Sequence, residues 1–92
     1  MGRTVMCRKF GGELPGLEKP PFPGPAGQDI YEHVSAQAWA AWIELQTMLI
    51  NENQINTMDA EGRKWLAEQR SAFFRNEDHA RPSGYVPPEQ AD

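Results

Sequence analysis

The sequence predicts an α+β domain in which an N-terminal two-stranded antiparallel β-hairpin packs on a three-helix core. Residues 3 to 8 alternate between the two faces of an extended chain, which is typical of a half-buried strand. Two later segments repeat apolar residues at helical spacing over several turns. The 92 residues include three tryptophans and four phenylalanines, the large side chains that a core of this size requires.

The hairpin is assigned from its alternation and its turn. Val5 and Cys7 fall on one face of the first strand, whereas the opposite face carries Thr4, Met6 and Arg8. A turn signal follows at Gly11 and Gly12, and residues 10 to 17 supply the returning strand. Because a two-stranded hairpin is marginally stable alone, we expect it to pack against helices.

A proline-rich connection comes next, with five of the eight prolines between residues 15 and 25. We expect an extended segment with polyproline II character. The favoured interpretation is a stiff linker that lays Phe22 onto the core, and the alternative is a docking segment for an aromatic-lined groove. A short helix is then predicted from about Pro25 to Val34, because helical spacing relates Gly27, Ile30, Tyr31 and Val34.

The longest predicted helix begins after Ser35, a good N-cap. Its apolar stripe is predicted at Trp39, Trp42, Ile43, Gln46, Leu49 and Ile50. The run QTMLINEN then becomes polar, and we expect Asn51 and Asn53 to end the helix, since asparagine tolerates the left-handed conformation. These amides are interpreted as structural, because they are poor acid–base groups and poor metal ligands.

The third helix is predicted from an N-cap at Asp59 to about Asn76. Its buried stripe is predicted at Trp65, Leu66, Gln69, Ala72 and Phe73. Gly62 is expected to weaken its start by about 1 kcal/mol relative to alanine. Residues 1–79 therefore form one domain, and residues 80–92, rich in proline and polar side chains, form a flexible C-terminal tail.

Composition excludes several classes of protein. The net charge of −4 argues against a nucleic-acid partner, although a small basic cluster is present at Arg3, Arg8 and Lys9. No apolar run is long enough for a membrane span or a secretory signal. One cysteine cannot form an intramolecular disulfide, so the expected location is the cytoplasm. No enzyme motif is present, and we do not expect catalysis.

Cys7 is the one soft ligand and the one strong potential nucleophile in the sequence. The favoured interpretation is that it packs as a small hydrophobe beside Val5. The alternative is a reactive thiol, because positive charges at Arg8 and Lys9 would lower its pKa. The alternative requires that the sulfur be accessible from water.

Two other sets of side chains offer metal ligands. Asp29 and His33 lie four residues apart on the first predicted helix, and Glu32 is close to both. We favour a dipole interpretation, with Asp29 in the first turn and His33 in the last. The run from Asn76 to His79 also carries oxygen and imidazole donors, and is interpreted as a solvated helix terminus.

The order of short motifs along the chain resembles a known family. The motifs are RTVMC at residues 3 to 7, GLE at 16 to 18, PFPG at 21 to 24, WA at 39 and 40, and QTMLINE at 46 to 52. Together they resemble the bacterial Fe(II)-trafficking protein family, also called YggX. The resemblance extends from residue 3 to residue 85, and QTMLINE is its most specific motif.

The resemblance implies a small cytoplasmic protein that mediates iron transactions, supplying or protecting iron for iron–sulfur cluster synthesis and repair and limiting oxidative damage. It implies that Cys7 is the functional thiol. Basic residues are common in the family where this chain has Gln28 and Asp29, and His33 is outside the family pattern. The pair formed by Asp29 and His33 is therefore not expected to be the family's iron site.

We expect a monomer that binds Fe(II) weakly and transiently and passes it to iron–sulfur enzymes or cluster-assembly proteins. Hard oxygen donors with at most one thiolate suit such loose binding. The metal ligands are unassigned, with Cys7 as a candidate. The alternative function is a non-metal interaction module that docks on a partner enzyme through its Trp-rich helix or its Pro-rich segment. An exposed aromatic patch would favour docking, whereas we expect Trp39 and Trp42 to be mostly buried.

Overall fold

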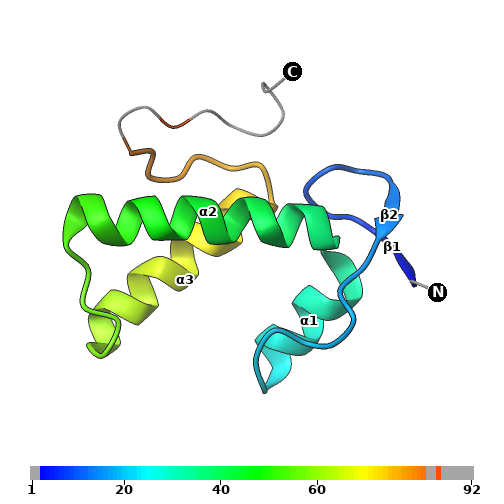
Figure 1. Ribbon diagram of the computed structural model, residues 1–92, viewed down its shortest axis with the longest axis horizontal. Coiled ribbons are helices and arrows are strands. Elements are labelled where there is room, and N and C mark those ends of the chain that lie inside the picture. The colour runs from blue at the N-terminus through cyan, green and yellow to red at the C-terminus, as the bar shows by residue number, and fades with distance from the viewer. Residues whose placement is uncertain (1–2, 83–84, 86–92) are drawn as a thin grey trace. The chain divides into compact units, whose positions relative to one another are not determined.

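The computed structural model describes residues 3–82 and 85, and it confirms the predicted α+β class (Figure 1). Five elements occur in the predicted order: β1 (Thr4–Met6), β2 (Glu13–Pro15), α1 (Pro25–His33), α2 (Ala36–Asn53) and α3 (Ala60–Phe74). The chain divides into two compact units, residues 1–40 and 41–92, so the boundary falls inside α2. None of the helices in the described part of the chain is long and apolar enough to cross a membrane.

The hairpin pairs β1 with β2 in an antiparallel sheet, and each strand is three residues long. The register places Val5 opposite Leu14. Beyond the strands, the Cys7 amide donates to the Gly12 carbonyl at 2.8 Å, and the Gly11 amide donates back to the Cys7 carbonyl at 2.8 Å. Gly11 has a φ of 71°, which few other residues adopt readily. The predicted alternation is confirmed, because Val5 and Cys7 are buried.

Arg3 ties the start of the hairpin to the segments around it. Its Nη1 donates to the Tyr31 carbonyl at 2.9 Å and to the Leu17 carbonyl at 3.3 Å. Its guanidinium carbon also lies 4.0 Å from the centre of the Tyr31 ring, a cation–π contact. Because β1 packs against α1 as well, the short sheet is held by α1 in addition to its own ladder.

The proline-rich connection packs as the linker interpretation predicted. The Phe22 ring lies 6.5 Å from the Trp39 ring, at an interplanar angle of 48°. A side chain at Gly27 would collide with the Phe22 carbonyl oxygen. Glycine at this point of α1 therefore allows the connection to lie directly against the helix.

The N-cap of α2 is confirmed, but the buried face of α2 differs from the predicted stripe. Ser35 Oγ accepts a hydrogen bond from the Ala38 amide at 3.1 Å. The fully buried residues are Ala38, Trp42, Leu45 and Leu49, whereas Ile43 is 39% exposed and Trp39 is half-buried. The buried stripe is rotated toward Ala38 and Leu45, which are both fully buried and were not in the predicted stripe. Trp42 is buried and Trp39 is only partly exposed, so the prediction that both tryptophans are mostly buried is confirmed.

The end of α2 also differs in detail from the prediction. The left-handed residue that follows the helix is Gln54, with a φ of 53°, rather than an asparagine. Asn53 instead satisfies a terminal carbonyl directly, with its Nδ2 donating to the Leu49 oxygen at 3.1 Å. The amides thus have the structural role that was predicted, by a different geometry.

In the second unit, Asp59 caps α3 as predicted, because its carboxylate accepts from the Glu61 amide at 3.2 Å. Gly62 also has a packing role in addition to its low helix propensity. A Cβ at this position would lie 2.7 Å from the Asn56 carbonyl oxygen, so glycine lets the preceding loop approach α3 closely. An aromatic cluster forms the core, with the Trp42 ring 5.9 Å from Phe73 and 6.4 Å from Phe74. The sequence pattern missed Phe74.

After α3 the described chain stays in contact with its own unit as far as residue 82. The His79 ring packs edge-on against Phe73 at 5.4 Å. The Ala80 amide donates to Gln69 Oε1 at 2.7 Å, and Pro82 is buried. Apart from Tyr85, the remainder of the predicted tail lies outside the described residues.

Candidate functional site

Cys7 lies at the end of β1 on the buried face of the hairpin. Its side chain is 1% exposed, and Val5 on the same face is 5% exposed. The packing interpretation of this cysteine is therefore confirmed. In this arrangement the sulfur has no direct access to ions or oxidants in solution, which the reactive-thiol hypothesis in its simplest form requires.

Hydrogen-bond donors nevertheless surround the Cys7 sulfur. Burial raises the pKa of the thiol, but hydrogen bonds from the Ser35 side chain and from the backbone of Phe10, Ser35 and Lys9 lower this pKa by more. The Ser35 amide lies 3.4 Å from Sγ. The net effect is a lowered pKa. The reactive-thiol alternative attributed a lowered pKa to positive charge on Arg8 and Lys9, whereas hydrogen bonds lower the pKa in the structure.

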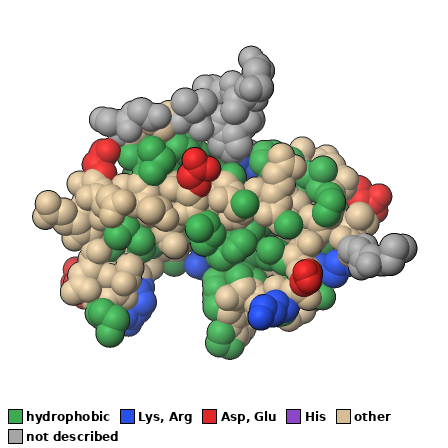
Figure 2. All heavy atoms as spheres, viewed as in Figure 1, with side chains coloured by type: hydrophobic (Ala, Val, Ile, Leu, Met, Phe, Trp, Pro, Cys, Tyr) green, Lys and Arg blue, Asp and Glu red, His purple; other side chains and the backbone are tan. Residues whose placement is uncertain are grey.

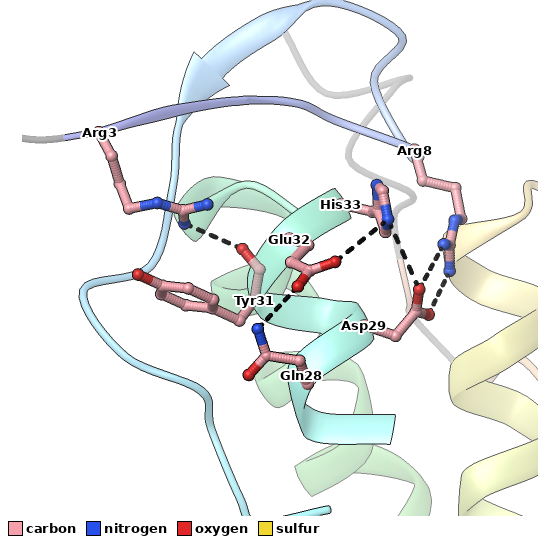
Figure 3. Close-up of polar contacts among 7 residues, drawn as sticks. All are labelled: Arg3, Arg8, Gln28, Asp29, Tyr31, Glu32 and His33. Carbon is pink, nitrogen blue, oxygen red and sulfur yellow. Dashed lines mark hydrogen bonds and ion pairs between the residues drawn. The ribbon is translucent and has the colours of Figure 1, made fainter. Parts of the chain in front are cut away.

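Arg8 fastens the segment that carries the thiol to α1. The Arg8 amide donates to the His33 carbonyl at 2.8 Å. Its guanidinium donates two hydrogen bonds to the Asp29 carboxylate, at 2.9 and 3.0 Å (Figure 3). These hydrogen bonds raise the pKa of the Arg8 guanidinium. Arg8 directly follows Cys7. Its contacts with His33 and Asp29 therefore help to hold the segment that carries the thiol against α1.

The same contact corrects the predicted role of Asp29. No acidic residue lies in the first turn of α1, because the helix begins at Pro25 and Asp29 lies in its middle. The carboxylate is therefore an ion-pair partner and not a helix-dipole residue. His33 does lie in the last turn, as predicted.

The small basic cluster of the N-terminal segment is not gathered on one exposed face. Arg3 is bound to backbone carbonyls and stacked on Tyr31, and Arg8 is bound to Asp29. Lys9 is 5% exposed. Arg3 and Arg8 thus make contacts within the first unit, and Lys9 is buried. This arrangement does not favour a phosphate-binding surface.

A second group of polar side chains lies on the outer face of α1. His33 Nε2 lies 3.9 Å from Asp29 Oδ1 and 3.8 Å from Glu32 Oε1 (Figure 3). Gln28 Nε2 donates to Glu32 Oε2 at 2.7 Å. Within residues 3–82 and 85, no three His, Cys, Asp or Glu side chains are arranged to hold a metal ion. The distances instead describe a loose cluster in which Arg8 already occupies one carboxylate.

The other predicted donor run, residues 76–79, does not extend α3 but bends back against its end. Asn76 has a φ of 59°, and the helix ends at Phe74. His79 Nδ1 lies 2.8 Å from the Ala80 carbonyl oxygen while its ring packs on Phe73. This imidazole therefore has a packing role in the turn after α3.

One groove in the first unit bears on the docking alternative. It has a volume of about 500 Å³ and is lined by Pro20, Pro21, Trp39 and neighbouring residues of the proline-rich connection. Trp42, by contrast, is 1% exposed. Figure 2 shows hydrophobic side chains exposed on the viewed face, with acidic and basic side chains at a few scattered positions. Of the two tryptophans on α2, only Trp39 is therefore partly exposed, and they form no exposed aromatic patch together.

Comparisons with known proteins agree with the motifs. Residues 1–88 match the family model described as "Bacterial Fe(2+) trafficking". Proteins named "Probable Fe(2+)-trafficking protein" are similar over almost their whole length. The one from Pseudomonas putida strain W619 is 60% identical over 88 residues, 96% of this chain and 98% of the relative. The one from Pseudomonas fluorescens strain SBW25 is 57% identical over 90 residues, 98% of this chain and 100% of the relative.

A relative from another organism gives the same result. The Alcanivorax borkumensis protein of the same name is 56% identical over 88 residues, which are 96% of this chain and 94% of the relative. These matches cover 96% or more of this chain. The chain therefore belongs to the bacterial Fe(2+) trafficking family.

Proposed function

We propose that this protein carries ferrous iron in transit, as a non-catalytic cytoplasmic monomer, and that Cys7 is the thiol through which it acts. The iron would serve the synthesis and repair of iron–sulfur clusters, and keeping it bound would limit oxidative damage. The observation that carries the proposal is the environment of Cys7: a buried sulfur among hydrogen-bond donors that lower its pKa.

A buried thiol of lowered pKa acts only when the segment that shields it opens. We call residues 7–12 the cover of Cys7, and the hairpin to which they belong is small. The sheet contains two strands of three residues each. Short elements of this kind open locally at a lower free energy than the core of a domain. Opening of residues 7–12 would present a sulfur that is already biased toward the thiolate, the form that binds metal and reacts with oxidants.

Ferrous iron suits a carrier of this kind on chemical grounds. Fe(II) stands near the weak end of the divalent affinity order, so one thiolate with carboxylate or water ligands holds it loosely. Loose binding allows transfer to a recipient with a complete ligand set. The recipients in this proposal are iron–sulfur enzymes or cluster-assembly proteins.

The docking alternative has less support. Its most apolar candidate anchor, Trp42, is buried among Phe73 and Phe74. The groove beside Trp39 is compatible with a small apolar ligand group. Nothing about its lining selects a particular partner, so we prefer the iron proposal.

The test is an anaerobic calorimetric titration with Fe(II), performed on the parent protein and on Cys7→Ser. The expected result is weak binding by the parent and weaker binding by the variant. Val5→Thr is a matched control, because it introduces a hydroxyl on the same buried face and leaves the sulfur in place. The role of Cys7 is refuted if Cys7→Ser and Val5→Thr bind iron equally well and protect iron–sulfur enzymes equally well in cells under superoxide stress.

A further inference from the structure

We propose that the hollowed face of α3 is an interaction surface, and that the partner it fits is a second copy of this chain, with the two α3 helices antiparallel. This surface lies in the second compact unit and does not involve Cys7, the thiol of the proposed function. The contact is weak and reversible, so the carrier remains a monomer when it is dilute.

The surface is a shallow hollow on one side of α3. It has a volume of about 470 Å³ and is lined in part by small side chains. Ala67, Ser71 and Ala72 recur at helical spacing and so share one face of the helix. The buried residues of α3 that pack in the core, Leu66 and Phe73 among them, do not line the hollow. Small side chains on an exposed face let a second helix approach closely.

Charged side chains border the hollow, and their signs alternate along the chain. They are Lys64, Glu68, Arg75 and Glu77, and all four are exposed. None of them forms an ion pair with another residue in the described part of the chain. Arg70 also lines the hollow but makes contacts of its own. The four bordering charges are therefore available to a partner.

The order of these charges makes the face complementary to itself. Glu68 and Arg75 lie equally far, in opposite directions, from a point between residues 71 and 72. In a twofold-symmetric antiparallel pair of helices that cross at this point, Glu68 of each copy faces Arg75 of the other. The dimer therefore gains this ion pair twice. A parallel pair in register would instead place like charges opposite each other.

The two outer charges extend the same pattern. Lys64 lies about one helical turn before Glu68, so in the antiparallel pair it meets the stretch that follows Arg75 of the other copy. Glu77 lies in that stretch, and its amide donates to the Ala72 carbonyl at 2.8 Å, which holds it beside the end of α3. Small residues thus occupy the centre of the contact and opposite charges its two ends. Such an arrangement selects the antiparallel orientation over others.

The expected strength follows from the size of the surface. A contact through one helix face falls below about 1,200 Å² of buried area, the range of weak and transient interfaces. Docking costs little side-chain entropy at the centre, because Ala67 and Ala72 have no rotamers to lose. The net charge of −4 keeps dilute copies apart. Pairing is therefore expected at high protein concentration.

The test is sedimentation equilibrium of the full chain from micromolar to millimolar concentration, with amide chemical shifts recorded over the same range. The parent should dimerise reversibly, and the shifts that change with concentration should centre on residues 64–77. A parent that stays monomeric throughout overturns the proposal, as does a dimer whose shifts centre on another part of the chain.

Charge reversal tests the antiparallel register. Glu68→Lys and Arg75→Glu each break two ion pairs in a symmetric dimer, so each should weaken dimerisation by about fivefold or more. The double variant that carries both substitutions should recover the parental strength. Glu44→Lys is the matched control, because it changes the net charge equally at an exposed position of α2 and should not weaken pairing. Equal weakening by Glu68→Lys and Glu44→Lys, or no recovery in the double variant, overturns the proposal.

A bulky residue in the hollow tests the close approach. Ser71 is exposed, so Ser71→Trp should leave the fold intact and hold the two helices apart; unchanged dimerisation in this variant contradicts the proposed contact. Melting curves identify any variant that fails to fold. Cys7→Ser should dimerise like the parent, and Glu68→Lys should bind Fe(II) like the parent. Failure of the thiol proposal and failure of this surface therefore give different results.

Discussion

The Ser35 amide lies 3.4 Å from the sulfur of Cys7, and this contact joins residues 28 positions apart in the sequence. Ser35 therefore does two things at once. Its hydroxyl caps α2 through the Ala38 amide, and its hydrogen bonds favour the thiolate of Cys7. One residue thus contributes both to the start of the longest helix and to the electrostatics of the thiol.

Replacement of Ser35 by alanine should therefore produce two effects together. Loss of the cap should lower the free energy of unfolding by about 0.5 to 2 kcal/mol. Loss of the hydroxyl should also raise the pKa of Cys7. Urea denaturation measures the first effect, and the pH dependence of thiolate absorbance measures the second. Ser35→Thr, which keeps a hydroxyl, should retain much of both; equal thiol titration in Ser35→Ala and the parent would contradict the assignment.

Stability should depend on pH through Cys7. A folded-state pKa below that of the unfolded chain, where cysteine titrates at about 8.5, means that the fold favours the thiolate. Its contribution is therefore fully present above the unfolded pKa and is lost as the pH falls through the folded pKa. The difference in free energy of unfolding between the parent and Cys7→Ala should grow in favour of the parent from pH 6 to pH 9.5. A constant difference would show that the fold does not shift the thiol.

Removal of the Asp29 carboxylate should make residues 7–12, which shield Cys7, open more often. An exposed ion pair contributes about 0.5 to 1 kcal/mol, so Asp29→Asn should speed thiol modification by about two- to fivefold in the absence of metal. Stopped-flow measurements with a thiol reagent give this rate. Glu32→Gln is the matched control, because its carboxylate belongs to the same helix face and makes no contact with Arg8 in the described structure. Equal acceleration by both variants would point to a general loosening of α1.

Trp42 should dominate the stability of the second unit. Truncation of a fully buried aromatic residue costs about 3 to 5 kcal/mol, and Trp42 contacts both Phe73 and Phe74. Trp42→Ala should therefore lower the melting temperature sharply, as measured by circular dichroism. Trp39→Ala removes an indole that is only half-buried and should cost less. A larger effect at Trp39 would reverse the assignment of the core face of α2.

Gly62 should not tolerate alanine, although alanine is the better helix former by about 1 kcal/mol. The added Cβ would lie 2.7 Å from the Asn56 carbonyl oxygen, and backbone atoms give way less readily than side chains. We expect Gly62→Ala to be destabilising in urea denaturation. Gly12→Ala is the comparison, because a Cβ there meets nothing within 4 Å. A stabilised Gly62→Ala would mean that the loop before α3 adjusts freely.

Local signals in the sequence predicted most of the fold. The alternation at residues 3 to 8, the cap residues Ser35 and Asp59, and the presence of three helices each depend on neighbours within a few positions, and each was found where expected. The predicted role of Asp29 was wrong because its partner is distant in the sequence. Asp29 was assigned to a helix dipole because Arg8, which binds it, is 21 residues away in the sequence.

The candidate site shows the same division. That the chain has one thiol, on the inner face of its first strand and within a family-specific set of motifs, is readable from the order of residues alone. Whether that thiol meets water, which groups shift its pKa, and what holds its cover closed depend on Ser35, Asp29 and His33, which only folding brings beside it. Periodicity reports which side of an element is apolar, because that property belongs to consecutive residues. Burial and hydrogen bonding at a particular atom are set by contacts between segments, and these exist only in the tertiary structure.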